Sequence, residues 1–180
     1  PLLTWGARAV VHFVVTNQVV AMTTKLDGAN TVFLPFNRGH EDGAGNPPDP
    51  EGPTTYFWRD VLDRDLWLKI LTKFMLVKTE QRIDPASGKQ KKSVSIRFPR
   101  FHQLSAVEAI VADVYATGAG GRYLIEHSAG SGKTDTIVWT AHRLAALHDA
   151  NNEKVFDSVI VVSDRRVLDK QIKDTIKQFA

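Results

Sequence analysis

The strongest chemical signal in this sequence lies in eight consecutive residues, HSAGSGKT at positions 127–134. Glycines at 130 and 132 let the backbone curl until successive N–H groups point inward, an arrangement that binds phosphate oxygens. Lys133 would reach the outer phosphates of a nucleotide as a mobile charge, and the Thr134 hydroxyl would ligate Mg²⁺. We therefore predict catalytic roles for Lys133 and Thr134. The predicted nucleotide contacts are Ser128, Ala129, Gly130, Ser131, Gly132, Lys133 and Thr134.

One position departs from the strict phosphate-loop pattern, because His127 stands where that pattern has Gly. Only the second half, Gly-x-Gly-Lys-Thr, is intact. At ordinary Gly usage, such a half-pattern arises by chance in a chain of this size with a probability on the order of 1%. The position of the half-pattern between a predicted strand and a predicted helix lowers the probability of a chance match further. The competing interpretation, a Gly-rich turn with an incidental Lys, is the weaker one.

Two segments beside the loop narrow the choice of nucleotide and partner. Gln103 begins a predicted helix, and its carboxamide can present a donor and an acceptor together to an adenine edge, which predicts ATP. Arg165 and Arg166 follow a predicted strand, and the carboxyl ends of strands in open α/β sheets line the ligand crevice. We expect these two to contact a DNA phosphate backbone. The open alternatives are an ordinary helix-start residue for Gln103 and surface ion pairs for the arginines.

The elements that must position the loop alternate between strand and helix. Apolar patterning predicts a helix from 102 to 117, and then strand 122–126, helix 134–149, strand 156–163 and a helix from 166. Short connections imply parallel strands and a right-handed crossover. The predicted fold class is α/β, a partial parallel sheet of the P-loop (RecA-like) kind with flanking helices.

The first half of the chain is organised differently. Three segments rich in β-branched residues predict strands at 9–15, 19–23 and 31–36. A Gly/Pro-rich stretch at 37–53 predicts a loop or linker, and an amphipathic helix follows it to Phe74, capped by Thr54 or Thr55. A polar stretch, 80–92, ends with lysines that either contact DNA or form a solvated hairpin tip: Lys89, Lys91 and Lys92.

Composition limits the class of protein without choosing a function. The chain has 180 residues, a formal charge of +3, 43% hydrophobic residues and no Cys. This balance is that of a globular protein, and the absence of Cys excludes disulfides and thiolate zinc sites. No stretch reaches the roughly 18 apolar residues of a membrane span. The chain begins without Met and ends inside a helical pattern, so we interpret it as an internal piece of a longer protein.

Five blocks, in order over nearly the whole chain, resemble the restriction (R) subunit of type I restriction endonucleases. They are FLPFNRG, GAGNPP, RFPRFHQL, HSAGSGKT and VFDSVIVVSDRRVLDKQ. Such subunits are bacterial, with a nuclease domain followed by a superfamily 2 helicase-like DNA translocase. The resemblance implies that residues 1–36 are the C-terminal part of the nuclease domain and that 37–96 are a linker with a connecting helix and a basic loop. Residues 97–180 would be the first part of motor lobe 1.

The resemblance also implies site residues and partners. Gln103 matches the adenine-reading Gln, the glycines with Lys133 and Thr134 match the first helicase motif, and the segment with Arg165 and Arg166 matches the next motif, which touches DNA. In this family the position of His127 is commonly not Gly. The implied partners are ATP, Mg²⁺, double-stranded DNA and the modification and specificity subunits, in the bacterial cytoplasm and without a membrane.

The same resemblance implies that parts of the active machinery lie elsewhere. We expect the acidic box and the arginine finger beyond Ala180 and the nuclease site before Pro1, so this piece alone would hydrolyse ATP poorly and would not cut DNA. The alternatives are another superfamily 2 helicase or translocase, a P-loop kinase or GTPase, and a non-catalytic adaptor with a vestigial loop. A kinase would show an Arg-rich lid and a GTPase an Asn-Lys-x-Asp guanine reader, and neither occurs in this sequence.

Overall fold

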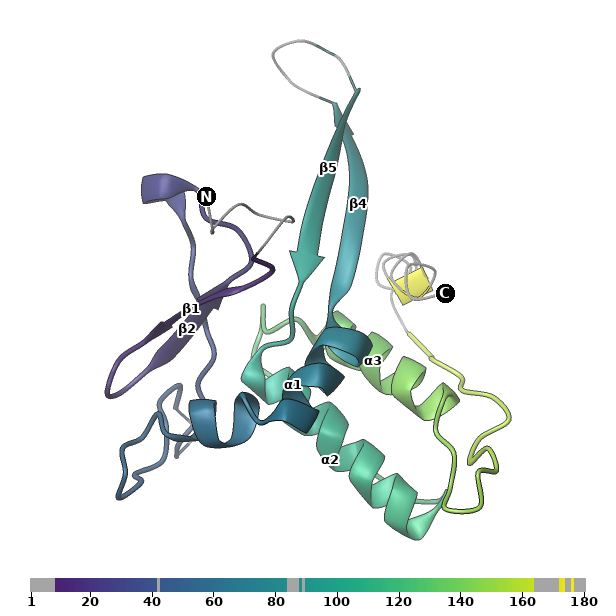
Figure 1. Cartoon of the computed structure of the whole chain (residues 1–180). Coiled ribbons are helices and arrows are strands. Elements are labelled where there is room, and N and C mark those ends of the chain that lie inside the picture. Colours follow the sequence, from purple (N-terminus) through teal and green to yellow (C-terminus); the bar gives the residue numbers. More distant parts are fainter. Residues whose placement is uncertain are drawn as a thin grey trace. The chain divides into compact units, whose positions relative to one another are not determined.

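The computed structural model describes residues 9–41, 43–83, 88, 90–163, 172–173 and 176. The chain divides into two compact units, Pro1–Phe101 and His102–Ala180. Figure 1 shows the helices and strands of both units, coloured along the sequence.

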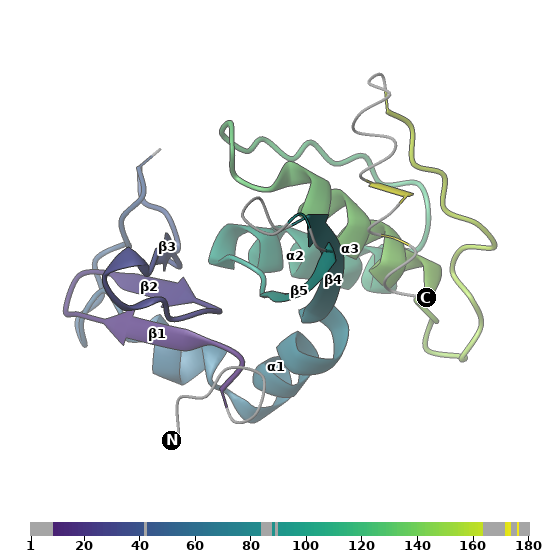
Figure 2. The ribbon, with the colours of Figure 1, turned by 90° about the horizontal axis from the view of Figure 1, so that it is seen from above.

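The first unit begins with a three-stranded antiparallel sheet in the order β1-β2-β3, seen from above in Figure 2. The strands are β1 (His12–Val15), β2 (Val20–Thr23) and β3 (Leu34–Pro35). The turn between β1 and β2 closes where the Thr16 N–H donates to the Val19 carbonyl at 2.9 Å. These two strands confirm the prediction. The third strand is shorter than predicted; Pro35 has no N–H for a ladder and stands on the edge strand.

Two asparagines hold the Gly/Pro-rich stretch after β3 to the sheet. Asn37 Oδ1 accepts from the Val20 N–H at 2.8 Å and from Asn46 Nδ2 at 3.0 Å. Asn46 also donates to the Gln18 carbonyl at 2.9 Å, and its Oδ1 accepts from the Arg38 N–H at 2.8 Å. The beginning of the stretch predicted as a linker is therefore a hydrogen-bonded loop, packed on the turn and second strand of the sheet.

The predicted helix ending at Phe74 is divided into three short pieces. They are η2 (Phe57–Val61), α1 (Arg64–Lys69) and η3 (Ile70–Phe74). Asp63 interrupts the helix with a ψ of 138° and caps α1, because its side chain accepts from the N–H groups of Asp65 and Leu66. Thr54, one of the two predicted caps, instead donates its hydroxyl to the Thr16 carbonyl at 2.9 Å. A strong Asp cap inside the apolar pattern thus decided where a new helix begins.

An aromatic cluster forms the core of the first unit. The ring centroid of Phe13 lies 4.7 Å from that of Phe57, 5.3 Å from that of Phe36 and 5.9 Å from that of Phe98. Phe36 is fully buried, and its carbonyl accepts the Tyr56 hydroxyl at 2.6 Å. Because these rings come from β1, the residue after β3, η2 and the segment after the hairpin, the cluster joins four separate parts of the unit.

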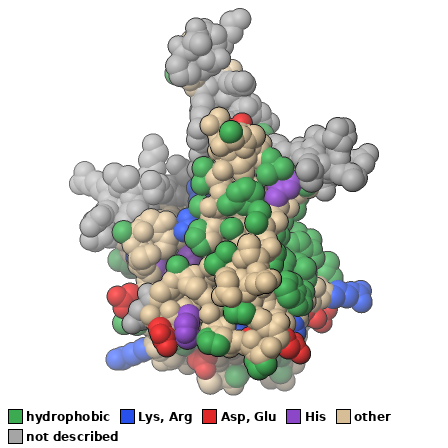
Figure 3. Space-filling model, turned by 90° about the vertical axis from the view of Figure 1, so that its left-hand side faces the viewer, with side chains coloured by type: hydrophobic (Ala, Val, Ile, Leu, Met, Phe, Trp, Pro, Cys, Tyr) green, Lys and Arg blue, Asp and Glu red, His purple; other side chains and the backbone are tan. Residues whose placement is uncertain are grey.

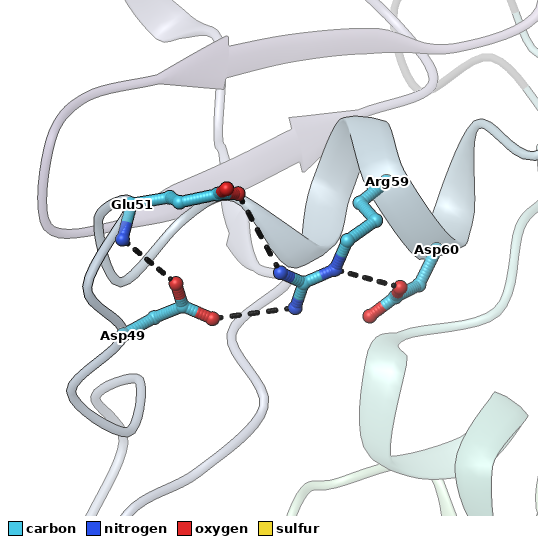
Figure 4. Close-up of polar contacts among 4 residues, drawn as sticks. All are labelled: Asp49, Glu51, Arg59 and Asp60. Carbon is cyan, nitrogen blue, oxygen red and sulfur yellow. Dashed lines mark hydrogen bonds and ion pairs between the residues drawn. The ribbon is translucent and has the colours of Figure 1, made fainter.

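Charged residues on the surface form a network around Arg59, drawn in Figure 4. Arg59 contacts Asp49 at 3.3 Å, Asp60 at 3.2 Å and Glu51 at 3.8 Å. The Glu51 N–H is the main cause that lowers the pKa of Asp49, and the Arg59 guanidinium adds to it. Since the side chain of Arg59 is 47% exposed, water screens these ion pairs and they stabilise the loop only weakly.

A long hairpin occupies the region that polarity alone predicts as a loop. Its strands, β4 (Leu76–Ile83) and β5 (Gln90–Arg97), pair antiparallel from Leu76 opposite Arg97 to Ile83 opposite Gln90. Leu76 and Ile96 are buried at its base, whereas Val77 and Ile83 are exposed. The polar composition of 80–92 concealed the strands, because cross-strand backbone bonds need no apolar side chains. Lys91 and Lys92 lie on β5, and Lys89 is outside the described residues.

The second unit contains two helices that confirm the predicted ones. They are α2 (Phe101–Thr117), whose first residue belongs to the first unit, and α3 (Lys133–Ala145). The buried residues of α2 include all those of its apolar pattern: Leu104, Val107, Ile110, Val111 and Val114. A close ion pair of Arg143 with Glu108 links α3 to α2. The prediction extended α3 to Asp149, but the helix ends four residues earlier.

Residues 122–126 and 156–163 are assigned to neither helix nor strand. Their apolar side chains reach solvent, with Leu124 93%, Ile160 83% and Val162 89% exposed. A parallel strand exists only with hydrogen-bonded neighbours, and residues 102–163 contain no strand. The parallel sheet of P-loop type therefore stays a prediction. No helix in the described part of the chain has the length and apolar content to span a membrane.

The aromatic cluster predicts a sharp contrast between two substitutions in the first unit. Phe36→Ala should lower the free energy of unfolding by about 3–5 kcal/mol, because it leaves a cavity among rings that cannot collapse freely. Val32→Ala, at a side chain that is 69% exposed, should cost less than about 0.5 kcal/mol. Apolar side chains such as this one lie at the surface beside charged ones, as Figure 3 shows for one face. Urea denaturation followed by tryptophan fluorescence measures both, and equal losses would contradict the assignment of the core.

Candidate nucleotide-binding loop

The residues predicted to bind phosphate form a loop that runs directly into α3. Gly132 is the N-cap of this helix with φ 86° and ψ 34°, and Gly130 also has a positive φ, 73°. Glycine adopts this left-handed backbone without the strain that other residues incur. His127 is not among the non-glycine residues with a positive φ. The departure from the strict pattern therefore carries no backbone strain, because position 127 does not require glycine.

Gly132 is also needed for space. A Cβ at this position would lie 2.5 Å from Nε2 of Gln103, whereas a Cβ at Gly130 would meet no atom within 4 Å. Gln103 approaches this closely because its Nε2 donates to the Gly132 carbonyl at 2.9 Å and to the Ser131 carbonyl at 3.3 Å. Glycine at 132 thus serves the close approach of α2 as well as the backbone turn.

The contacts from α2 set the direction of the loop amides. The Ser131 carbonyl also lies 3.2 Å from Nε2 of His102, next to Gln103 on the same helix. In a planar trans peptide the N–H points opposite to the C=O. Carbonyls held toward α2 at positions 131 and 132 therefore direct the N–H groups of Gly132 and Lys133 away from α2. That orientation leaves both amides available to a phosphate at the helix N-terminus.

Gln103 has a different observed contact from the one predicted for it. Its side chain is 3% exposed, and the donor half of its carboxamide faces the loop carbonyls. The contact with adenine stays a prediction. Sequence reasoning gave no role to His102, although its place at the start of the same predicted helix, beside Gln103, was a usable signal.

Lys133 and Thr134 occupy the first two positions of α3. The Lys133 side chain is exposed, and its Nζ donates to the Ser128 carbonyl at 2.7 Å, which holds the ammonium over the loop. The Ser131 N–H points to the same carbonyl at 3.3 Å. An exposed lysine can exchange this carbonyl for a phosphate oxygen at little cost. The partly buried Thr134 offers a single hydroxyl, which suits Mg²⁺ that keeps waters and phosphate oxygens as its other ligands.

His127 lies at the entrance of the loop against His102. The two rings meet edge to face, with centroids 4.7 Å apart and planes at 84°. Nδ1 of His127 is buried and has no hydrogen-bond partner in the described part of the chain. Burial is the larger cause that lowers the pKa of His127, and the charge of Lys133 lowers it further. Both causes favour the neutral form of this imidazole.

The segment that leads into the loop runs beside α2. Together with Ala106, Ala109 and Ile110 of that helix, residues 122–126 line a groove of about 560 Å³. The Tyr123 hydroxyl donates to Asp113 Oδ2 at 2.5 Å, and this bond is the main cause that raises the pKa of Tyr123. The chain is thus tied to α2 before the loop as well as within it.

The structure brings most of the predicted site together in the second unit. Gln103, Ser131 and Gly132 are in direct contact, and Ser128 contacts Lys133. The predicted DNA contacts, Arg165 and Arg166, lie outside the described residues.

One comparison with known proteins is informative. Residues 102–180 match the family model described as SWI2/SNF2 ATPase. The matched range begins at His102 and contains Gln103 and the whole loop. It indicates a superfamily 2 helicase-like ATPase, and an ATPase domain implies bound ATP, typically with Mg²⁺. No curated protein and no solved structure matches the chain.

The two glycines of the loop predict different losses of stability. Gly130→Ala should lower the free energy of unfolding by about 1–2 kcal/mol, the cost of a left-handed backbone with a Cβ. Gly132→Ala should cost roughly 2–5 kcal/mol, because it also displaces the Gln103 amide from buried carbonyls. Thermal unfolding of the two variants side by side checks this. Equal losses would show that the approach of Gln103 contributes nothing.

The environment of His127 predicts a pH dependence of stability. Its pKa is lowered from the ordinary value of 6.5 in the folded chain, so below pH 6.5 the unfolded chain binds the proton first. The contribution of His127 to the free energy of unfolding should therefore be fully present above pH 6.5, and it should decrease as the pH drops below that value. In His127→Phe this decrease should be smaller. Denaturation midpoints at a series of pH values measure the difference, and parallel curves for the two proteins would contradict it.

Proposed function

We propose that this chain is part of the ATP-dependent motor subunit of a type I restriction endonuclease. In that role it binds ATP with Mg²⁺, and the whole subunit translocates double-stranded DNA before endonucleolytic cleavage. The observation that carries the proposal is the phosphate-binding loop, with intact Lys133 and Thr134, within a range that matches the SWI2/SNF2 ATPase family.

The ATPase part of the proposal is supported by the geometry of the loop. The amides of Gly132 and Lys133 are directed away from α2, and an exposed ammonium stands beside them. The helix dipole of α3 adds a positive end at the same place. These groups together suit the charged phosphates of a nucleotide and have no comparable use in a plain strand-to-helix turn.

The restriction part rests on the resembling blocks in the first unit. Two of these, FLPFNRG and GAGNPP, meet in one loop, where Asn37 Nδ2 donates to the Ala44 carbonyl at 2.8 Å. The Gly39 N–H donates to the Gly45 carbonyl at 2.9 Å in the same loop. The two resembling blocks are thus joined to each other by hydrogen bonds within this loop. The proposal places the chain in a protein of the bacterial cytoplasm that assembles with modification and specificity subunits.

Substitution of Lys133 tests the nucleotide site. Lys133→Ala removes one charge-assisted contact to phosphate, worth roughly 1.5–3 kcal/mol, so the affinity for ATP should fall about tenfold to a hundredfold. Lys154→Ala, at an exposed lysine after α3, is the matched control and should bind ATP like the unsubstituted chain. Titration of a fluorescent ATP analogue measures both.

The restriction role is tested in the full-length subunit assembled with its partner subunits. Hydrolysis of ATP should rise with unmethylated duplex DNA and should collapse in Lys133→Ala. Hydrolysis that ignores DNA would overturn the translocase proposal and favour a P-loop kinase or GTPase. Hydrolysis stimulated by any duplex, without cleavage, would indicate another superfamily 2 translocase instead.

A further inference from the structure

The loop is held to α2 at both of its ends, and one residue takes part in both contacts. The His102 ring packs against His127 at the start of the loop, and its Nε2 lies 3.2 Å from the Ser131 carbonyl at the end. Three residues, Ser128 to Gly130, separate the two contacts from each other. His102 therefore bridges the span of backbone that must curl around a phosphate.

The two contacts constrain each other. To donate to the Ser131 carbonyl, Nε2 of His102 must carry a hydrogen. That hydrogen must also lie near the plane of the carbonyl group and its substituents, where the lone pairs of the oxygen point. Rotation of the imidazole about its last side-chain bond would break this alignment. An edge-to-face neighbour resists that rotation, because such ring pairs have a preferred geometry. The His127 ring, at 84° to His102, supplies this neighbour.

We propose that His102 and His127 act as a pair of positioning residues that holds the Ser131 carbonyl toward α2 and so directs the Gly132 amide to a phosphate. This inference rests on the proposed binding of a nucleotide at the loop. It gives a purpose to the residue that departs from the strict pattern. A glycine at 127 would fit the backbone, but it would remove the ring against which His102 packs.

The expected consequence is a change in nucleotide affinity through preorganisation of the loop. His127→Gly should weaken ATP and ADP binding by roughly threefold to tenfold, the range expected for the loss of one aromatic pair. His127→Phe keeps the edge-to-face ring and should recover most of that affinity. His102→Phe keeps the ring but loses the donor, so it should bind nucleotide as weakly as His127→Gly. His148→Phe, at an exposed histidine after α3, is the matched control.

Equilibrium titration of the 180-residue chain with fluorescent ATP and ADP measures these affinities, and thermal unfolding reports the fold of each variant. Should His127→Gly fail to fold, His127→Leu replaces it, since Leu fills the space without an aromatic ring. Weaker binding in His127→Leu than in His127→Phe supports the pair. Equal binding by these two variants, or His127→Gly binding like the unsubstituted chain, overturns it.

Two further measurements separate this inference from the proposed function. In the assembled full-length subunit, His127→Gly should raise the KM for ATP by a larger factor than it lowers kcat, because the pair prepares the loop before the reaction; the reverse ratio would contradict the inference. Lys133→Ala serves as the reference for loss of the nucleotide contact itself.

The binding titration is the second measurement. If the unsubstituted chain binds no ATP, the proposed function fails. If it binds ATP and only Lys133→Ala weakens binding, the nucleotide site stands and the histidine pair alone is rejected.

Discussion

The hydrogen bonds from α2 to the carbonyls of Ser131 and Gly132 are the contacts on which the rest of the site depends. They fix two consecutive peptide planes, and through them the direction of the amides at the start of α3. The positive φ of Gly132, the absence of a side chain there and the burial of Gln103 all serve the same close approach. A loop without this support would have to order its amides at the moment of binding.

The first unit is stabilised by different means. The strands of its three-stranded sheet are short, and β3 has only two residues, so the backbone ladder of this sheet alone gives little stability. The aromatic cluster around Phe13 and Phe36 compensates by joining rings from four parts of the chain. Asn37 and Asn46 then satisfy the backbone of a loop in which glycines and prolines prevent a regular ladder. Together, ring packing and side-chain amides supplement the short strands of the three-stranded sheet.

The secondary structure was predictable for segments with strong apolar periodicity or clear turn residues, and it was not predictable for the other segments. The hairpin of β1 and β2 and the helix α2 follow directly from β-branched runs and from apolar residues at helical spacing. The strands β4 and β5 were not predicted, although a hairpin tip was one of the two alternatives for 80–92, since the outer half of the hairpin is polar and paired through the backbone. The break at Asp63 was missed because a cap competes with periodicity, and composition does not show which of them prevails. The parallel sheet stays a prediction, because strands at 122–126 and 156–163 need partners that local sequence does not specify.

The sequence by itself determined the prediction of the site's chemistry, because two glycines, a lysine and a threonine between a predicted strand and helix are typical of phosphate binding. It also determined the position of Gln103, but not its partner. Only the tertiary structure decided that Gln103 and His102 face the loop carbonyls and that His127 packs on His102. These contacts join residues that are 25 to 29 positions apart in the chain. No local pattern specifies such a distance, because it depends on how α2 and α3 pack.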